Sequence, residues 1–182
     1  VDLFLILNTG DDFEHLGLHI SPDIDTVTYT LAGKNNPITG WGRRDETWTF
    51  MEALAELGGE TWFSLGDGDL AIHVERTRRL LAGESLSQIT EDFSRTLGIS
   101  AHLLPMTDDP LRTIIETPEG AISFQDYFVR RQSKPAIENI VFEGADKAVP
   151  SAAALDALQL PDLRAVVICP SNPFLSIDPI LA

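Results

Sequence analysis

The sequence predicts an α/β fold of Rossmann-like type, with a mostly parallel sheet covered by helices on both faces. Residues 3–7 and 165–169 form two short, continuous apolar runs, a composition typical of fully buried parallel strands. Apolar positions recur at helical spacing between Asp45 and Leu57, where we expect Asp45 to be the N-cap and Gly58 to end the helix. Strands that alternate with helices favour a parallel sheet.

Breaking residues mark the other expected elements. Ser21 before Pro22 is typical of an N-cap followed by the first helical position, so we expect a helix from Asp23 toward Leu31. The remaining expectations are helices at 69–81, 87–97 and 151–158, and strands at 101–104, 112–117 and 139–143.

We expect one α/β domain over residues 1–182, because no repeat, low-complexity tract or clear linker divides the chain. Val1 already lies in an expected buried strand, and residues 178–182 begin an apolar helical turn without continuation. The sequence therefore predicts that this domain is an incomplete part of a longer chain.

The charge balance argues against several classes of partner. With 28 acidic and 13 basic side chains, the chain has a net charge of −15, which repels nucleic-acid phosphates and anionic membrane surfaces. No apolar run approaches the roughly 20 residues of a spanning helix, and residues 1–7 lack the features of a signal peptide. We expect a cytoplasmic protein that binds neither nucleic acid nor membrane, and the sequence leaves a homodimer open. The single Cys169 lies in the apolar run 165–169, which predicts a buried structural thiol.

The turn Asn8-Thr9-Gly10-Asp11-Asp12 follows the first expected strand at its carboxyl end, where open α/β sheets bind ligands. Two adjacent carboxylates suit a divalent cation such as Mg²⁺, whose shell is usually completed by substrate phosphates. The alternative is a turn in which Asp11 accepts hydrogen bonds from backbone amides and Asp12 is solvated.

Asp25 is the second candidate metal ligand, because it lies near the start of the next expected helix. Together with Thr26 and Tyr29 it could face the same crevice as Asp11. The neighbouring Asp23 is explained by the unpaired amides and the dipole of a helix N-terminus.

The glycine-punctuated loop 33–44 carries Lys34, Arg43 and Arg44 and no acidic residue. In so acidic a chain, it supplies the local positive charge that an anionic substrate needs. Arginine pairs could clamp a phosphate bidentately, and Trp41 could stack on a flat ring. The alternative is a solvated loop that caps the next helix.

Two further turns are candidates for ligand contact. Asp67 ends a strand-like apolar run in a Gly-Asp pair similar to the one at Asp11. Ser171 and Asn172 directly follow the run 165–169 and suit a nucleotide phosphate or base edge, although asparagine also forms ordinary turns. The four histidines show no metal-ligand spacing and no Ser-His-Asp or Walker pattern occurs, so hydrolase chemistry lacks support.

Taken together, these motifs resemble the 2-phospho-L-lactate transferase family. The resemblance is carried by residues 8–18, 21–26, 29–31, 40–48, 65–67, 69–70, 170–173 and 176–177. It covers nearly the whole chain, and the first block is long and specific.

The resemblance implies a magnesium-dependent transferase of coenzyme F-420 biosynthesis with a Rossmann-like fold. Such an enzyme moves a phospholactyl-type or phosphoenolpyruvyl-type group from a guanosine diphosphate-activated donor to the terminal ribityl hydroxyl of the deazaflavin Fo and releases GMP. The roles it implies are catalysis by Asp11, Asp12 and Arg44, metal binding by Asp11 and Asp25, and substrate binding by Asn8, Thr9, Gly10, Asp25, Thr26, Tyr29, Arg43, Asp67, Ser171 and Asn172.

Two departures from the family pattern define an alternative. The family's glycine-rich loop is absent before residues 1–7, and Gly68 stands where family members commonly have arginine. Both favour a non-catalytic nucleotide- or deazaflavin-binding regulatory module of the same fold. An enzyme of related fold with another nucleotide donor is a third interpretation.

Overall fold

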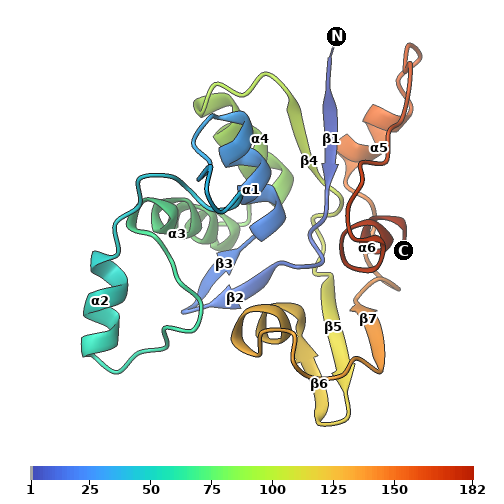
Figure 1. Ribbon diagram of the computed structural model, residues 1–182. Coiled ribbons are helices and arrows are strands. Elements are labelled where there is room, and N and C mark those ends of the chain that lie inside the picture. Colours follow the sequence, from blue (N-terminus) through green and yellow to red (C-terminus); the bar gives the residue numbers. More distant parts are fainter. Residues whose placement is uncertain (1) are drawn as a thin grey trace.

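A computed structural model describes residues 2–182, so the expectation that Val1 lies in a buried strand falls outside the described residues. The strand β1 (Phe4–Leu7) pairs in parallel with β4 (His102–Pro105), with Leu5 opposite Leu103. Figure 1 shows α1 (Pro22–Leu31) and α4 (Leu86–Thr96) on one side of this pair and α5 (Ala152–Leu158) on the other. This arrangement confirms the α/β class, with helices on both sides of a parallel pair.

The core beneath α1 and α4 consists of apolar residues at inward-facing positions of the strands and helices. Leu7 and Leu103 come from β1 and β4, and Ile24 and Leu86 come from the two helices. Helix α4 begins with a capping box, in which the side chain of the N-cap Ser85 accepts a hydrogen bond from the backbone amide of residue 88.

An antiparallel hairpin leaves the parallel pair directly after Asp12. Its strands β2 (Phe13–His15) and β3 (Leu18–Ile20) are joined by Leu16 and Gly17, which both have positive φ values of 53° and 73°. Two positive φ values in a two-residue turn match the right-handed twist of the flanking strands. Phe13 and Ile20 pack with Met51 of α2 (Thr49–Glu56) and with Leu65.

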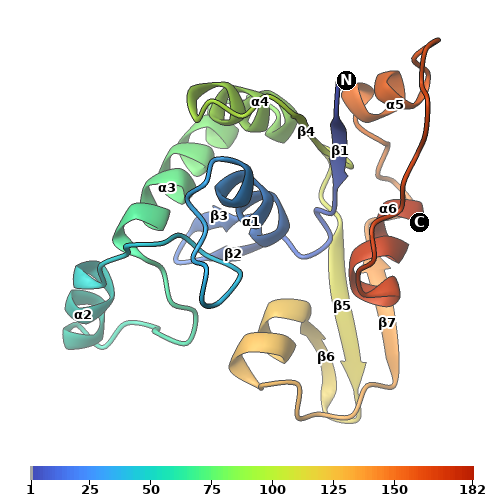
Figure 2. The same cartoon turned by 45° about the horizontal axis from the view of Figure 1, so that its top comes forward.

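A second antiparallel sheet continues from β4. Its order is β6 (Gly120–Ser123), β5 (Arg112–Thr117) and β7 (Asn139–Glu143). The π-helix η1 (Asp126–Arg130) follows β6, and its Tyr127 packs with Ile115 and Phe124. Figure 2 shows this sheet at the opposite end of the molecule from α2 and from the start of α3 (Asp67–Leu81). Parallel pairing is thus confined to β1 and β4 within the described residues.

The helix expected from Asp45 to Leu57 begins later in the structure. Asp45 has a φ of 57°, a left-handed conformation that an N-cap does not adopt, and Trp48 occupies the N-cap position of α2. Gly58 has a φ of 76° and terminates this helix as expected. The other expected helices and strands agree with the structure to within about two residues, the usual uncertainty of helix ends.

The prediction of a buried strand at 165–169 is wrong. Val166, Val167 and Ile168 are 64%, 76% and 66% exposed, and Cys169 is also exposed rather than a buried thiol. The segment has an apolar composition, but it pairs with no strand of residues 2–182, and an unpaired extended segment cannot bury both faces. The chain continues into the π-helix η2 (Pro173–Ile177) and α6 (Asp178–Leu181). None of the helices in the described part is long and apolar enough to cross a membrane.

Candidate active site

The turn after β1 is buried and held by its own side chains. Asn8 and Thr9 are 4% and 2% exposed. The Asn8 Oδ1 atom accepts from the Gly10 amide at 2.8 Å, while its Nδ2 atom donates to Asp23 Oδ2 at 3.0 Å and to the carbonyl of Leu175 at 3.2 Å. Asn8 therefore joins the end of β1 to the first turn of α1 and to η2.

Gly10 allows a close crossing of two segments. A Cβ atom there would lie 2.9 Å from Thr113 Oγ1 and 3.0 Å from Asn8 Oδ1. The Gly10 carbonyl also accepts from the Thr113 amide at 2.6 Å, which fixes the start of β5 against the turn. A larger residue at this position would separate β5 from the turn.

Asp11 is a buried carboxyl whose pKa is raised to about 8. Burial is the largest cause, the charges of Asp23 and Asp12 add to it, and the nearby polar side chains of Thr113 and Asn8 oppose it. The pKa of Asp23 is also raised, again chiefly by burial. Three carboxyl groups therefore share a small region in which at least one retains a proton at neutral pH unless a cation is bound.

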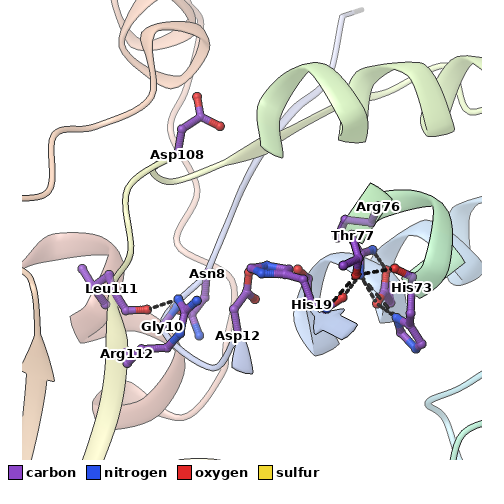
Figure 3. A network of polar contacts seen from close by, with 12 residues as sticks. Asn8, Gly10, Asp12, His19, His73, Arg76, Thr77, Asp108, Leu111 and Arg112 are labelled. Carbon is purple, nitrogen blue, oxygen red and sulfur yellow. Dashed lines mark hydrogen bonds and ion pairs between the residues drawn. The ribbon is translucent and has the colours of Figure 1, made fainter. Parts of the chain in front are cut away.

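Asp12 is oriented by two side chains on the hairpin and at the start of α1. Its Oδ2 atom accepts from Ser21 Oγ at 2.8 Å and lies 3.0 Å from His19 Nε2. The Oδ1 atom is buried without a hydrogen-bond partner. Figure 3 shows Asp12 between the Gly10 turn and His19. One carboxylate oxygen is thus fixed by its two contacts, and the other is available to accept a proton.

The oxygens of this region fit a hard divalent cation. Asp11 Oδ1, Asp12 Oδ1, Thr9 Oγ1 and Thr113 Oγ1 are all buried without hydrogen-bond partners. Among residues 2–182, no group of three or more His, Cys, Asp or Glu side chains is close enough to hold a metal by itself. A Mg²⁺ ion here would therefore depend on substrate and water oxygens, as is common for this ion.

Asp25 has a different partner from the one expected. Arg76 Nη1 donates to Asp25 Oδ2 at 3.1 Å, and Arg76 Nη2 donates to Asp25 Oδ1. Both oxygens of this buried carboxylate are therefore engaged by a buried guanidinium. The cation that neutralises Asp25 in this structure is therefore Arg76, and not the metal ion that the sequence predicts for it.

Tyr29 belongs to the same buried polar network as Asp25 rather than to the Asp11 turn. Its hydroxyl donates to Asp69 Oδ1 at 2.6 Å, and the other oxygen of Asp69 lies 3.2 Å from His73 Nε2. Burial raises the pKa of Tyr29 far above its usual value, and the charge of Asp69 adds to this shift. Thr26 is half-buried, and its carbonyl accepts from Thr30 Oγ1 at 2.7 Å.

The arginines of the loop 33–44 lie apart from the carboxyl cluster. Arg43 Nη1 donates to the carbonyl of Gly68 at 3.0 Å, and Arg44 is exposed with its Nε 3.9 Å from Asp45 Oδ2. Asp67 accepts from the amides of residues 49 and 50 at 3.1 and 2.9 Å and so caps α2. Hydrogen bonding, first of all from Thr47, lowers the pKa of this carboxyl.

Ser171 and Asn172 are exposed at the start of η2. Asn172 Oδ1 accepts from the amides of Phe174 and Leu175 at 3.0 and 3.1 Å, so this side chain caps η2. The carbonyl of Leu175 receives the bond from Asn8, which links this segment to the turn after β1. No other polar contact joins the two residues to the Asp11 turn within the described chain.

A cavity of about 270 Å³ opens beside Asp11 and Asp12, and β5, β6 and η1 supply most of its other walls. Its lining includes Trp62, Arg112 and Gln125, none of which the sequence analysis identified. Gln125 is only 6% exposed. No motif marks these residues, because long-range contacts bring them near Asp11. Arg112 and Gln125 approach through the contact of β5 with Gly10, and Trp62 approaches through its packing against Phe13.

Comparison with known proteins places this geometry in context. The sequence matches the family described as "2-phospho-L-lactate transferase CofD" over residues 1–182. A "2-phospho-L-lactate transferase" of Methanopyrus kandleri is 43% identical over 182 residues, which are 100% of this chain and 58% of that protein. A "phosphoenolpyruvate transferase" of Kitasatospora aureofaciens is 42% identical over 186 residues, which cover 100% of this chain and 57% of that protein.

A solved structure gives the same fold at lower identity. A protein member of the UPF0052 family from Bacillus halodurans superimposes with a TM-score of 0.60 at 16% identity, covering all of this chain and 55% of that one. This chain therefore spans little more than half the length of the relatives that it matches. The family match extends over every residue of the sequence, and the chain belongs to the 2-phospho-L-lactate transferase CofD family.

Proposed function

We propose that the protein containing this chain transfers a phospholactyl- or phosphoenolpyruvyl-type group from a guanosine diphosphate-activated donor to the deazaflavin Fo in coenzyme F-420 biosynthesis, with release of GMP. The observation that carries this proposal is the cluster of the buried Asp11 and Asp12 with the half-buried Asp23 beside a cavity, in a chain of the CofD family. A carboxyl cluster at a strand end suits the binding of a phosphorylated substrate together with a cation.

The transfer needs one new bond and one broken bond at the β-phosphorus of the donor. The terminal hydroxyl oxygen of Fo bonds to this phosphorus, and the bond from the phosphorus to the oxygen that bridges to the α-phosphate breaks, so that GMP leaves. The proton of the hydroxyl passes to Asp12 Oδ1, the buried oxygen without a partner. Ser21 and His19 hold the other oxygen of Asp12 and so orient the base.

Mg²⁺ fits the oxygens around Asp11, and when bound it would neutralise negative charge on the transferring phosphate. Asp11, with Thr9 and Thr113 beside it, would hold the ion, and Asp23 would add negative charge nearby. Without a cation, the buried Asp11 carboxylate is poorly solvated, and its pKa is therefore raised.

The test is turnover of Fo with a guanosine-activated donor, followed by mass spectrometry of the deazaflavin product. We expect product from the parent and a loss of about 10²- to 10⁴-fold in kcat for Asp12→Asn, because the variant has no base at the correct position. Binding of Fo without any product would instead support a non-catalytic deazaflavin-binding module. Equal competition by GDP and UDP would reject the guanosine donor and favour an enzyme with another nucleotide.

A further inference from the structure

The cavity beside Asp11 and Asp12 has a strongly unbalanced charge. Its lining contains the four carboxyl groups of Asp11, Asp12, Glu14 and Asp126, and Arg112 is the single lysine or arginine among the lining residues. A donor that carries a diphosphate would be repelled by this lining unless positive charge were supplied at the same place. Arg112 is the side chain of the described cavity wall that can supply it.

The guanidinium of Arg112 is oriented but not neutralised. Its Nη1 atom donates to the carbonyl of Leu111 at 2.7 Å, which restricts where the group can point. No carboxylate of residues 2–182 lies within ion-pair distance of it, and its cross-strand neighbour Glu143 on β7 forms no ion pair with it. Arg76, by contrast, is fully engaged by Asp25.

The position of Arg112 relative to Asp11 is fixed by the backbone. The next residue, Thr113, donates its amide to the Gly10 carbonyl at 2.6 Å, and its buried Oγ1 has no hydrogen-bond partner. Figure 3 shows Arg112 beside Gly10, on the side of the turn away from His19. An arginine, a hydroxyl and two carboxyl groups therefore converge on one cavity from β5 and from the turn after β1.

We propose that Arg112 is a catalytic residue of the transfer, whose free N–H groups donate to the non-bridging oxygens of the phosphate that is transferred. Arginine suits this role because its planar fork of donors matches two phosphate oxygens at once. This inference rests on the proposed function, and it gives to Arg112 the phosphate contact that the sequence suggested for Arg44.

The experiment compares Arg112→Ala and Arg112→Lys with Arg164→Ala, a control that removes an equal charge from an exposed residue outside the cavity. Turnover of Fo and binding of GDP by calorimetry are measured in the protein at its full length. We expect Arg112→Ala to lower kcat/KM about 10- to 100-fold and to weaken GDP binding at least fivefold, with the melting temperature within a degree or two of the parent. Arg112→Lys should recover part of the loss, because it restores the charge but not the fork, and Arg164→Ala should match the parent.

The possible failures can be told apart. If the parent converts Fo and Arg112→Ala stays within twofold of it, the inference is overturned while the proposed function stands. If the parent does not convert Fo, the proposed function fails, and GDP binding still decides on Arg112: equal affinity in parent and variant, or no binding in the parent, overturns the inference. A loss of activity that Arg164→Ala reproduces would also overturn it, since the effect would then be one of net charge.

Discussion

Arg76 and Asp25 form a buried two-point ion pair that joins α3 to the first turn of α1. Their side chains are 1% and 8% exposed, and both carboxylate oxygens accept from the guanidinium. Arg76 also donates to the carbonyl of His19 at 3.3 Å, so the same arginine contacts the hairpin that carries a partner of Asp12. The pair therefore positions the two elements that border the candidate site.

Asp25→Asn should be strongly destabilising, because it leaves a buried guanidinium without its charged partner. Removal of one member of a buried ion pair typically costs about 3 to 5 kcal/mol of unfolding free energy. Denaturant unfolding of the variant measures this loss. If Asp25 were a metal ligand instead, the variant would keep its stability and lose its response to Mg²⁺, and that result would contradict the structure.

Asp11→Asn should stabilise the metal-free protein. The pKa of Asp11 is raised from its ordinary 3.8 to about 8, so the unfolded chain loses this proton at lower pH than the folded one does. The parent therefore loses stability as the pH rises from about 4 to 8, while below this range and above it the contribution of Asp11 is constant. We expect the variant to be more stable than the parent by up to about 5 kcal/mol at pH 7.5, since the difference grows by about 1.4 kcal/mol for each pH unit above 3.8, and by almost nothing at pH 3.5.

Melting curves of Asp11→Asn and the parent across this pH range, in a chelating buffer, test the expectation. Added Mg²⁺ should raise the melting temperature of the parent more than that of the variant, because the parent has a carboxylate for the ion. A variant that is less stable than the parent at pH 7.5 would show that the buried carboxyl is favourable in the folded state.

The carboxyl cluster illustrates how far the sequence alone could lead. The apolar run before Asn8 and the pair Asp11-Asp12 predict carboxylates at a strand end, and the structure has them there. The start of a helix explains Asp23 locally, but its contact with Asn8 crosses 15 residues of chain and has no local signal.

Arg112 and the segment 165–169 show the limits of local patterns in two other ways. Arg112 lies beside Asp11 because β5 crosses the Gly10 turn, a long-range contact that neither residue type reveals. The segment 165–169 has the composition of a buried strand. An apolar composition does not by itself provide a neighbouring strand to pair with, and the segment is exposed among the described residues.

Tyr29→Phe should weaken the network that joins α1 to α3. The variant loses the hydrogen bond of 2.6 Å from the Tyr29 hydroxyl to Asp69, which should cost about 1.5 to 3 kcal/mol since the acceptor is charged. Burial acts to raise the pKa of Asp69, but its bonds with His73 and Tyr29 outweigh this effect and lower it. The stability that Asp69 contributes is therefore present above its ordinary pKa and is lost as the pH falls through the lowered one.

Unfolding of Tyr29→Phe and the parent at pH 7 and near pH 2.5 measures this contribution. We expect the difference to be full at pH 7 and smaller in acid, as the pH falls below the ordinary value of 3.8 and Asp69 takes up a proton. Thr30→Ala is a matched control on the same helix, because it removes an exposed hydroxyl that bonds only to its own helix. A difference that does not change with pH would mean that the hydroxyl stabilises α1 independently of the charge on Asp69.

Arg44→Ala tests whether Arg44 or Arg112 contacts the transferred phosphate. The sequence pattern predicts a loss of about tenfold or more in kcat/KM on removal of Arg44, the scale of one charged hydrogen bond. In the structure this side chain is exposed, its nearest carboxylate is Asp45 at 3.9 Å, and it does not line the cavity beside Asp11. Since an exposed ion pair contributes little, we expect the variant to keep kcat/KM within about twofold of the parent and to melt at nearly the same temperature. Steady-state kinetics of Arg44→Ala beside Arg112→Ala decide the matter, and a larger loss for Arg44→Ala would return the phosphate contact to the loop 33–44.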